Sequence, residues 1–225
     1  MSFFHHPGLY YPNALWSKGP WSLGAKKHGH CRIYSPDETH AIARTYGKQL
    51  NGITCCSKTT PQNAIAARMI AAAPDMTQVI ALLSLGGYFA RNRQSTKFLR
   101  CHMQAWHMAC EVITQISSPT DIPELNTSLK TTDALIKLIH SGPWTIEKQH
   151  CIRDSSGTGI CQLTGLHNPA DATLIVETPA MAGICLDIYF DLRLHNPNET
   201  EINIVEMCTN ADSIEDRLSK ALPQK

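Results

Sequence analysis

The chain lacks an excess of charge of either sign, and this limits the partners that its overall field could attract. Its 225 residues include 20 Lys and Arg against 19 Asp and Glu, which gives a formal net charge of +1. Long-range attraction to nucleic acid or to an anionic membrane needs a clear excess of positive charge. Any polyanion site must therefore be a local patch, and nucleic acid is not the partner we expect.

Long apolar runs and a secretory leader are also missing. The longest candidate run, residues 79–85, is far shorter than the roughly 18–20 apolar residues of a membrane-spanning helix. The N-terminus has no basic start followed by an apolar stretch and a small-residue cleavage site. We expect a soluble cytoplasmic protein with no membrane partner.

The cysteines form no disulfide framework. There are nine of them, an odd number, and apart from the vicinal Cys55–Cys56 they are scattered singly. Reduced and mostly buried thiols are the prediction. Two groups of His and Cys, within 28–31 and 101–110, contain no Cys-x-x-Cys pair, so we predict no metal site and no cofactor.

What the sequence does contain is an internal repeat. The Gly-Pro-Trp motif at 19–21 recurs at 142–144, and the segment 63–76 recurs as 168–181 without a gap. The two motifs follow one another in the same order both times, which predicts two diverged copies of one unit. The first copy is longer, and its extra segment 47–58 is expected to form a loop or an additional hairpin.

Both copies show the same order of elements. Turn residues between short extended runs predict an antiparallel meander, with strands at 31–34, 41–45, 145–152 and 159–164. A helix should then begin at Pro61 and at Pro169, because each proline follows a capping residue. Pro74 and Pro179 lie within these helices and predict a kink or a restart.

Helical spacing of apolar residues predicts two further helices between the copies, at 91–117 and 132–140, with a hinge at 118–124. Residues 186–194 alternate like a strand, but the repeat favours a helix there. We predict a strand at 202–207 and a terminal helix at 213–222 that Asp212 caps.

The predicted fold class is α+β, with two repeated units that each hold a small antiparallel β-meander followed by a Pro-kinked helix. The expected divisions are an N-terminal arm (1–18), the first repeat (19–90), a helical connector (91–141), and the second repeat with a C-terminal strand and helix (142–225).

The repeat motifs also carry a resemblance. Gly19-Pro20-Trp21 followed by Asn63-Ala-Ile-Ala-Ala-Arg-Met-Ile-Ala-Ala-Ala-Pro74 resembles a widespread group of phage and prophage proteins of unassigned activity. These proteins read Gly-Pro-Trp, then short strands, then an Asn-Ala-Arg-Leu-Ile-Ala-Ala-Ala-Pro helix. The resemblance covers about 19–85, and more weakly 142–190. It implies a phage origin and a bacterial host cell, and it supplies no catalytic residues.

Six residues form the candidate ligand-binding set. Tryptophans of both motifs could stack a base, and arginines could bind phosphate. The set is Trp21, Arg32, Arg44, Arg68, Trp144 and Arg153. The alternative for the tryptophans is structural, because a tryptophan after Gly-Pro at the start of a sheet typically anchors the core.

No local motif specifies a catalytic residue. A nucleophilic Cys needs a base that only the fold can place beside it. The Ser-Ser-Gly-Thr-Gly segment at 155–159 lacks the Gly-Lys-Ser/Thr ending of a phosphate loop, so it predicts a hairpin turn. We therefore predict no catalytic residue, and expect a binding protein more than an enzyme.

The leading hypothesis is a phage-encoded, non-catalytic protein that acts on a host component and sequesters a small anionic, nucleotide-like defence signal. A groove between the two units would hold that ligand. The alternatives are an inhibitor that masks a host protein, an enzyme that uses Cys and His, and a nucleic-acid module. The sequence leaves a homo-oligomer open.

Overall fold

The computed structural model describes most of the chain. The described residues are 19–24, 31–35, 41–45, 49–50, 53–54, 61–117, 128–147, 150–164, 169–194 and 200–220. Several expectations fall outside them, namely the N-terminal arm, the cysteine pair at 55–56, the hinge at 118–124 and the capping residues before Pro61 and Pro169.

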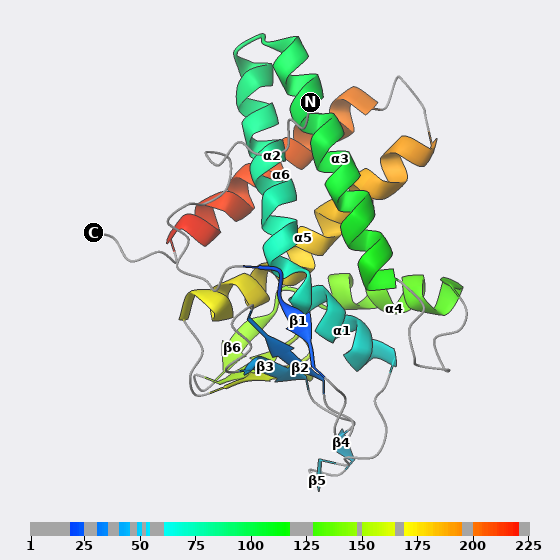
Figure 1. The fold of residues 1–225 in the computed structure, drawn as a ribbon, viewed down its shortest axis with the longest axis vertical. Helices are drawn as coiled ribbons and strands as arrows, with labels where there is room; N and C mark the ends of the chain where they lie inside the picture. Colours follow the sequence, from blue (N-terminus) through cyan, green and yellow to red (C-terminus); the bar gives the residue numbers. More distant parts are fainter. Residues whose placement is uncertain are drawn as a thin grey trace.

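One six-stranded antiparallel sheet contains strands from two separate parts of the sequence (Figure 1). The predicted antiparallel meanders are confirmed, since three strands come from each expected copy and are followed by helices. The first group is β1 (Ser22–Leu23), β2 (Arg32–Tyr34) and β3 (Ala41–Thr45), and the second is β6 (Thr145–Glu147), β7 (Cys151–Arg153) and β8 (Gly159–Leu163).

The two groups join through their last strands, in the order β1-β2-β3-β8-β7-β6. Arg44 of β3 lies opposite Gln162 of β8, and the neighbouring pairs are Ala43 with Leu163 and Thr45 with Cys161. The structure therefore merges the expected meanders into one sheet whose centre is the β3–β8 pair.

Helices α1 (Pro61–Ala71) and α5 (Pro169–Leu194) pack against one face of this sheet. The other helices, α2 (Ala73–Arg91), α3 (Ser95–Ser117), α4 (Ser128–His140) and α6 (Thr200–Lys220), pack on these two and on one another. Both predicted proline starts are confirmed by α1 and α5. The chain bends by 54° between α1 and α2, next to Pro74, whereas α5 continues as one helix through Pro179.

The Gly-Pro-Trp motifs pack against these helix prolines in both halves. A Cβ on Gly19 would lie 2.6 Å from Cβ of Pro74, and a Cβ on Gly142 would lie 3.1 Å from Cβ of Pro179. A side chain at Gly19 would overlap the proline ring, and one at Gly142 would require the ring to shift by a few tenths of an ångström. Each motif thus places the start of its strand group directly on the prolyl turn of its helix.

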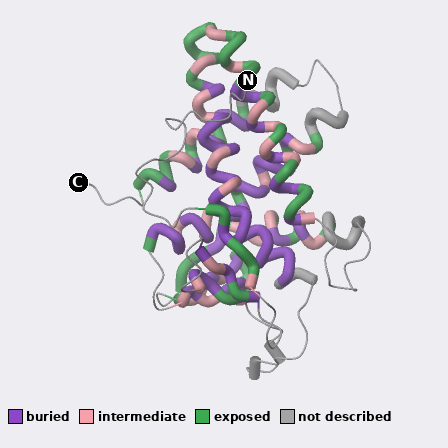
Figure 2. The backbone as a smooth tube through the Cα atoms, viewed as in Figure 1, coloured by how far each residue is buried: buried purple, intermediate pink, exposed green. Residues whose placement is uncertain are grey.

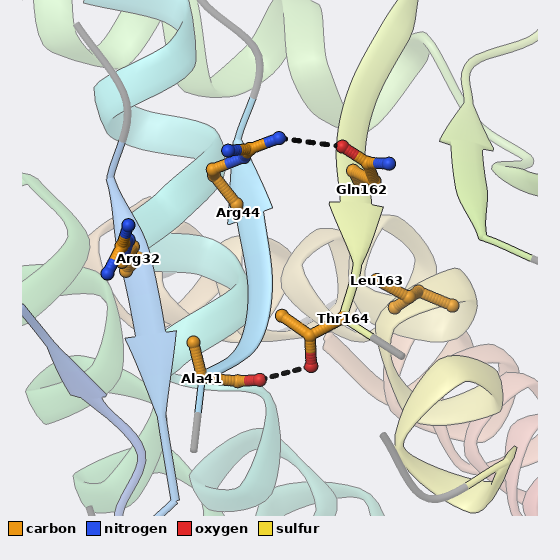
Figure 3. Close-up of a pocket in the computed structure, with 6 residues that line it drawn as sticks. All are labelled: Arg32, Ala41, Arg44, Gln162, Leu163 and Thr164. Carbon is orange, nitrogen blue, oxygen red and sulfur yellow. Dashed lines mark hydrogen bonds between the residues drawn. The ribbon is translucent and has the colours of Figure 1, made fainter. Parts of the chain in front are cut away.

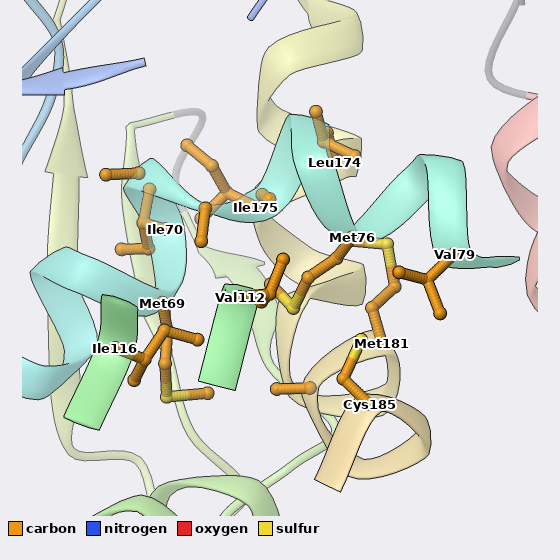
Figure 4. Packing of buried hydrophobic residues seen from close by; sticks show 14 of the residues in the cluster. Met69, Ile70, Met76, Val79, Val112, Ile116, Leu174, Ile175, Met181 and Cys185 are labelled. Atoms are coloured by element: carbon orange, nitrogen blue, oxygen red, sulfur yellow. The ribbon is translucent and has the colours of Figure 1, made fainter. Parts of the chain in front are cut away.

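The core extends from the contact between sheet and helices into the packing between the helices, and its residues include equivalent positions of the repeated motif (Figures 2 and 4). Ile70 and Ile175 are fully buried in one cluster, as are Met76 and Met181. Burying a large apolar side chain stabilises the fold by about 1.5–3 kcal/mol. The same positions of both copies therefore contribute to one shared core.

Three sequence predictions need correction. Residues 202–207 belong to helix α6 and not to a strand. Met207, Ala211, Ile214 and Leu218 are all buried, a helical spacing that a six-residue window could not reveal. Asp212 lies inside α6, so it does not cap a helix.

The third correction concerns 145–152, which is not one strand but the two strands β6 and β7. The helix chosen for 186–194 is confirmed as the end of α5. The extra hairpin expected in 47–58 is present as β4 (Gln49–Leu50) and β5 (Ile53–Thr54).

Among the described residues, one helix is long and apolar enough to cross a membrane, and a bent helix pair would be a second candidate if the pair were a single span. They are Pro169–Phe190 and the bent pair Ala64–Ala71 with Ala73–Arg91. In the most apolar stretch of the first, 56% of the residues are buried inside the protein, as in the core helix of a globular fold.

Candidate functional site

The outer face of the sheet, opposite the helices, carries two of the six predicted site residues. Arg32 of β2 and Arg44 of β3 lie directly opposite each other in the strand register. They line a hollow of about 340 Å³ in the middle of the sheet (Figure 3). Its other lining residues are Ala41, Gln162, Leu163 and Thr164.

Strand alternation explains why both arginines face outward. Successive side chains of a strand point to opposite faces, and Ile33 and Ala43, the neighbours of the two arginines, are fully buried under the helices. The register that places Ile33 opposite Ala43 also places Arg32 opposite Arg44. Burial of the apolar pair thus fixes the positions of the two cations.

Gln162 and Thr164 complete the hollow from the second strand group. A guanidinium nitrogen of Arg44 donates a hydrogen bond of 2.8 Å to the side-chain oxygen of Gln162. The Thr164 hydroxyl donates to the carbonyl of Ala41, and its backbone N–H donates to the carbonyl of Ile42 at 3.0 Å. Residues from the two distant strand groups are therefore held together across the β3–β8 seam.

Among the described residues, the charge that lines the hollow is positive only. In the described part of the chain, neither Arg32 nor Arg44 forms an ion pair with a carboxylate, and no acidic residue lines the hollow. Like charges on directly opposite strand positions destabilise a sheet. An anion between the two guanidinium groups would relieve this repulsion.

The site is asymmetric although the strand pairing around it is symmetric. One row across the outer face runs Arg32, Arg44, Gln162, Cys151. Gln162 occupies in the second group the place of Arg44 in the first, and Cys151 occupies that of Arg32. Only the first group therefore supplies cations, and the second supplies a neutral acceptor and a thiol.

The remaining predicted residues do not join this hollow. Trp21 and Trp144 are 3% and 1% exposed, and the indole N–H of Trp144 donates 3.2 Å to the Ser141 hydroxyl. Both rings belong to the hydrophobic core. This placement agrees with the structural alternative for the tryptophans, and a base has no exposed ring to stack on at either position.

The other two arginines have structural neighbours. Arg68 is buried and donates a hydrogen bond of 3.1 Å to the carbonyl of Ile116, so it joins α1 to α3. Arg153 forms an ion pair with Glu147 and donates 2.6 Å to the carbonyl of Gly157. We place both outside the candidate site.

Sequence reasoning missed Gln162 and Thr164. No motif marks them, because both are common polar residues in a strand and at its end. Their signal is the strand register, which places Gln162 beside Arg44. Knowledge that β3 pairs with β8 would have identified Gln162 as a neighbour of Arg44. No local feature of the sequence favours that strand pairing over others.

Cysteine and metal chemistry finds little support in the described part. Burial raises the pKa of Cys101, Cys161, Cys185 and Cys208, the last to about 11, and a raised pKa opposes formation of the nucleophilic thiolate. Among described residues, no three His, Cys, Asp or Glu side chains are grouped so that they could hold a metal ion.

The segment 155–159 forms the predicted hairpin turn between β7 and β8. One carboxylate oxygen of Asp154 accepts hydrogen bonds from the backbone N–H groups of Ser156 and Thr158, at 2.9 and 2.8 Å. Gly157 has a φ of +81°, which favours glycine. The N–H groups that a phosphate loop would offer to a ligand are thus bonded to Asp154.

Comparison of the chain with family models, with curated proteins and with solved structures finds no match.

Proposed function

We propose that the protein is a non-catalytic binding protein that holds a small, phosphate-bearing ligand on the outer face of its sheet. The observation that carries this proposal is the adjacent pair Arg32 and Arg44, which face one hollow without a carboxylate partner among the described residues. Guanidinium groups bind phosphate oxygens through paired hydrogen bonds and keep their charge at all ordinary pH values.

The size of the hollow supports a small ligand. Its volume of about 340 Å³ lies at the lower end of the roughly 300–1,000 Å³ of typical ligand pockets. The Gln162 side chain offers a neutral group that can orient a sugar or a base. Sequestration of a nucleotide-like host signal is therefore the most specific form of the proposal.

The proposal includes an origin for the two similar strand groups. We infer that the chain arose by duplication of one unit, a strand group followed by a helical segment whose proline packs on the Gly-Pro-Trp motif. The matched contacts of Gly19 with Pro74 and of Gly142 with Pro179 support this inference. So does the buried cluster that holds Ile70 with Ile175.

A phage origin and a host target extend the proposal and rest on the resemblance of the repeat motifs. A protein-masking inhibitor stays an alternative, since the outer sheet face is open to a larger partner as well. The raised thiol pKa values at four cysteines favour either binding function over a cysteine enzyme.

The test is a calorimetric titration of the full chain with inorganic pyrophosphate and with a mixture of ribonucleotides. Arg44→Gln and Arg32→Gln should each weaken binding about tenfold to a hundredfold, because each removes charge-assisted hydrogen bonds worth about 1.5–3 kcal/mol. Gln162→Glu should weaken ligand binding as much, since the new carboxylate would pair with Arg44 while the side chain keeps almost the same size and shape.

Lys137→Gln is the matched control. It removes one positive charge from an exposed position of α4, on the helical side of the protein, and should leave the affinity unchanged. If all four variants bind pyrophosphate and nucleotides like the parent chain, the proposed site is wrong. Native mass spectrometry of the protein purified from bacterial lysate then identifies any ligand that co-purifies.

A further inference from the structure

The hairpin between α2 and α3 is unlike the rest of the chain in charge. No Asp or Glu occurs between Met76 and Cys110, a stretch that contains Arg91, Arg93, Lys97 and Arg100. The whole chain has a net charge of only +1, so the positive charge is concentrated locally. We call residues 88–103 the hairpin tip.

The hairpin tip also exposes large apolar side chains. Tyr88 is 54% exposed, Leu99 56% and Met103 59%. Leu99 and Met103 lie one turn apart on α3 and therefore share a side of that helix. Large apolar residues gathered beside cations are typical of a contact surface.

Most cations of the tip have no acidic partner in the part of the chain that the structure describes. Arg91 pairs with Asp212 of α6 at 3.0 Å. Within the described residues, Arg93, Lys97 and Arg100 form no ion pair, and Lys97 lies over the ring of Phe89 at 5.2 Å. Three positive charges at the tip are thus available to an anionic partner.

Arg93 occupies a backbone position that disfavours it. Its φ is +56°, in the left-handed region where glycine is the least strained residue. Strained backbone positions occupied by other residues cluster at functional sites. The position lies in the turn between the helices, at the far end of the hairpin.

We propose that the hairpin tip docks on the surface of an anionic lipid bilayer. Lipid phosphates attract Arg and Lys close to the surface, and the acyl boundary takes up exposed apolar side chains. Nucleic acid would satisfy the cations but would leave Leu99 and Met103 in water. A second copy of the chain would bring like charges together, which opposes self-association through this surface.

The tip and the candidate ligand site are far apart in the fold. The turn between α2 and α3 projects at one end of the helical layer, and the sheet lies at the other end (Figure 1). The tip is largely exposed along its turn (Figure 2). The protein could therefore bind a ligand on the sheet while the tip is in contact with a membrane.

The experiment is co-sedimentation of the full chain with phosphatidylcholine vesicles, with and without phosphatidylglycerol. Binding should require phosphatidylglycerol and fall with added salt. The double variant Lys97→Gln/Arg100→Gln should bind about thirtyfold more weakly, on the basis of about 1 kcal/mol for each cation at the surface. Leu99→Ser and Met103→Ser should each weaken binding about tenfold at unchanged charge.

Lys137→Gln/Lys220→Gln removes the same charge from elsewhere and should bind like the parent chain. Arg93→Gly separates function from stability, since it should raise the melting temperature and yet weaken vesicle binding. Equal binding by the two double variants would overturn the proposal. The proposal would also be wrong if the parent chain bound duplex DNA but not vesicles, and if the tip variants abolished the DNA binding.

Discussion

The first and second strand groups, with the helices that follow them, are similar where they are buried and different where they face solvent. In both, a Gly-Pro-Trp motif places its glycine against a helix proline and buries its tryptophan. On the outer face, Arg32 and Arg44 of the first group correspond to Cys151 and Gln162 of the second.

Burial explains this difference between the two strand groups. A buried side chain contacts many neighbours, so a substitution there leaves a cavity or forces overlap. An outward strand residue contacts few, and its replacement costs little stability. Packing therefore restricts the buried positions of both strand groups to similar residues, whereas the exposed face tolerates a charge pattern on one side only.

The largest expected effect tests whether the two tryptophans are equivalent. Trp144→Ala and Trp21→Ala should each lower the free energy of unfolding by about 3–5 kcal/mol, because each removes a large buried ring. Chemical denaturation followed by circular dichroism measures this loss. If one variant keeps the parent stability, the two motifs do not have the same role.

A smaller loss of stability is expected when the glycines that contact the helix prolines are replaced. Gly19→Ala and Gly142→Ala should each cost about 1–3 kcal/mol through overlap with a proline ring. Gly19→Ala should cost more, since its new Cβ would meet Pro74 at 2.6 Å against 3.1 Å for Gly142 and Pro179. Thermal melts of both variants rank them, and the reverse order would contradict the closer packing of Gly19 on Pro74.

The smallest effect concerns Asp75, which corresponds to Ala180 in the second copy. Burial, and then the nearby Glu111, raise the pKa of the Asp75 carboxyl. The folded protein therefore binds this proton more tightly than the unfolded chain, and the free energy of unfolding falls as pH rises from about 4 through the raised pKa.

Asp75→Asn should remove that fall and stabilise the protein slightly at pH 7. Denaturation at pH 4 and at pH 7 checks this, with Asp133→Asn on the exposed side of α4 as the control. A variant that is less stable than the parent at pH 7 would show that the Asp75 carboxylate contributes favourable contacts there.

Much of the fold could be predicted from local signals. Pro61 and Pro169 marked the helix starts, and the repeat correctly favoured a helix over 186–194. The prediction failed at 202–207, where six residues with strand-like alternation belong to a helix. Short windows of apolar residues fit both periods, and only contacts with distant elements choose between them.

Less of the candidate site could be predicted. Arg32 and Arg44 were among the six suggested residues, and the structure brings them together beside one hollow. Trp21, Trp144 and Arg68 are buried, and Arg153 pairs with Glu147. Composition identifies residues that could bind phosphate, but exposure and neighbours decide which of them can.

The sequence by itself determined the repeated motifs, the short strands and the proline starts of the helices that follow them, because these depend on residues close together in the chain. Only the tertiary structure decided that β3 pairs with β8. That pairing joins segments far apart in the chain. It forms because each strand satisfies the open edge of the other, and because the apolar faces of the helices behind them are buried in one core.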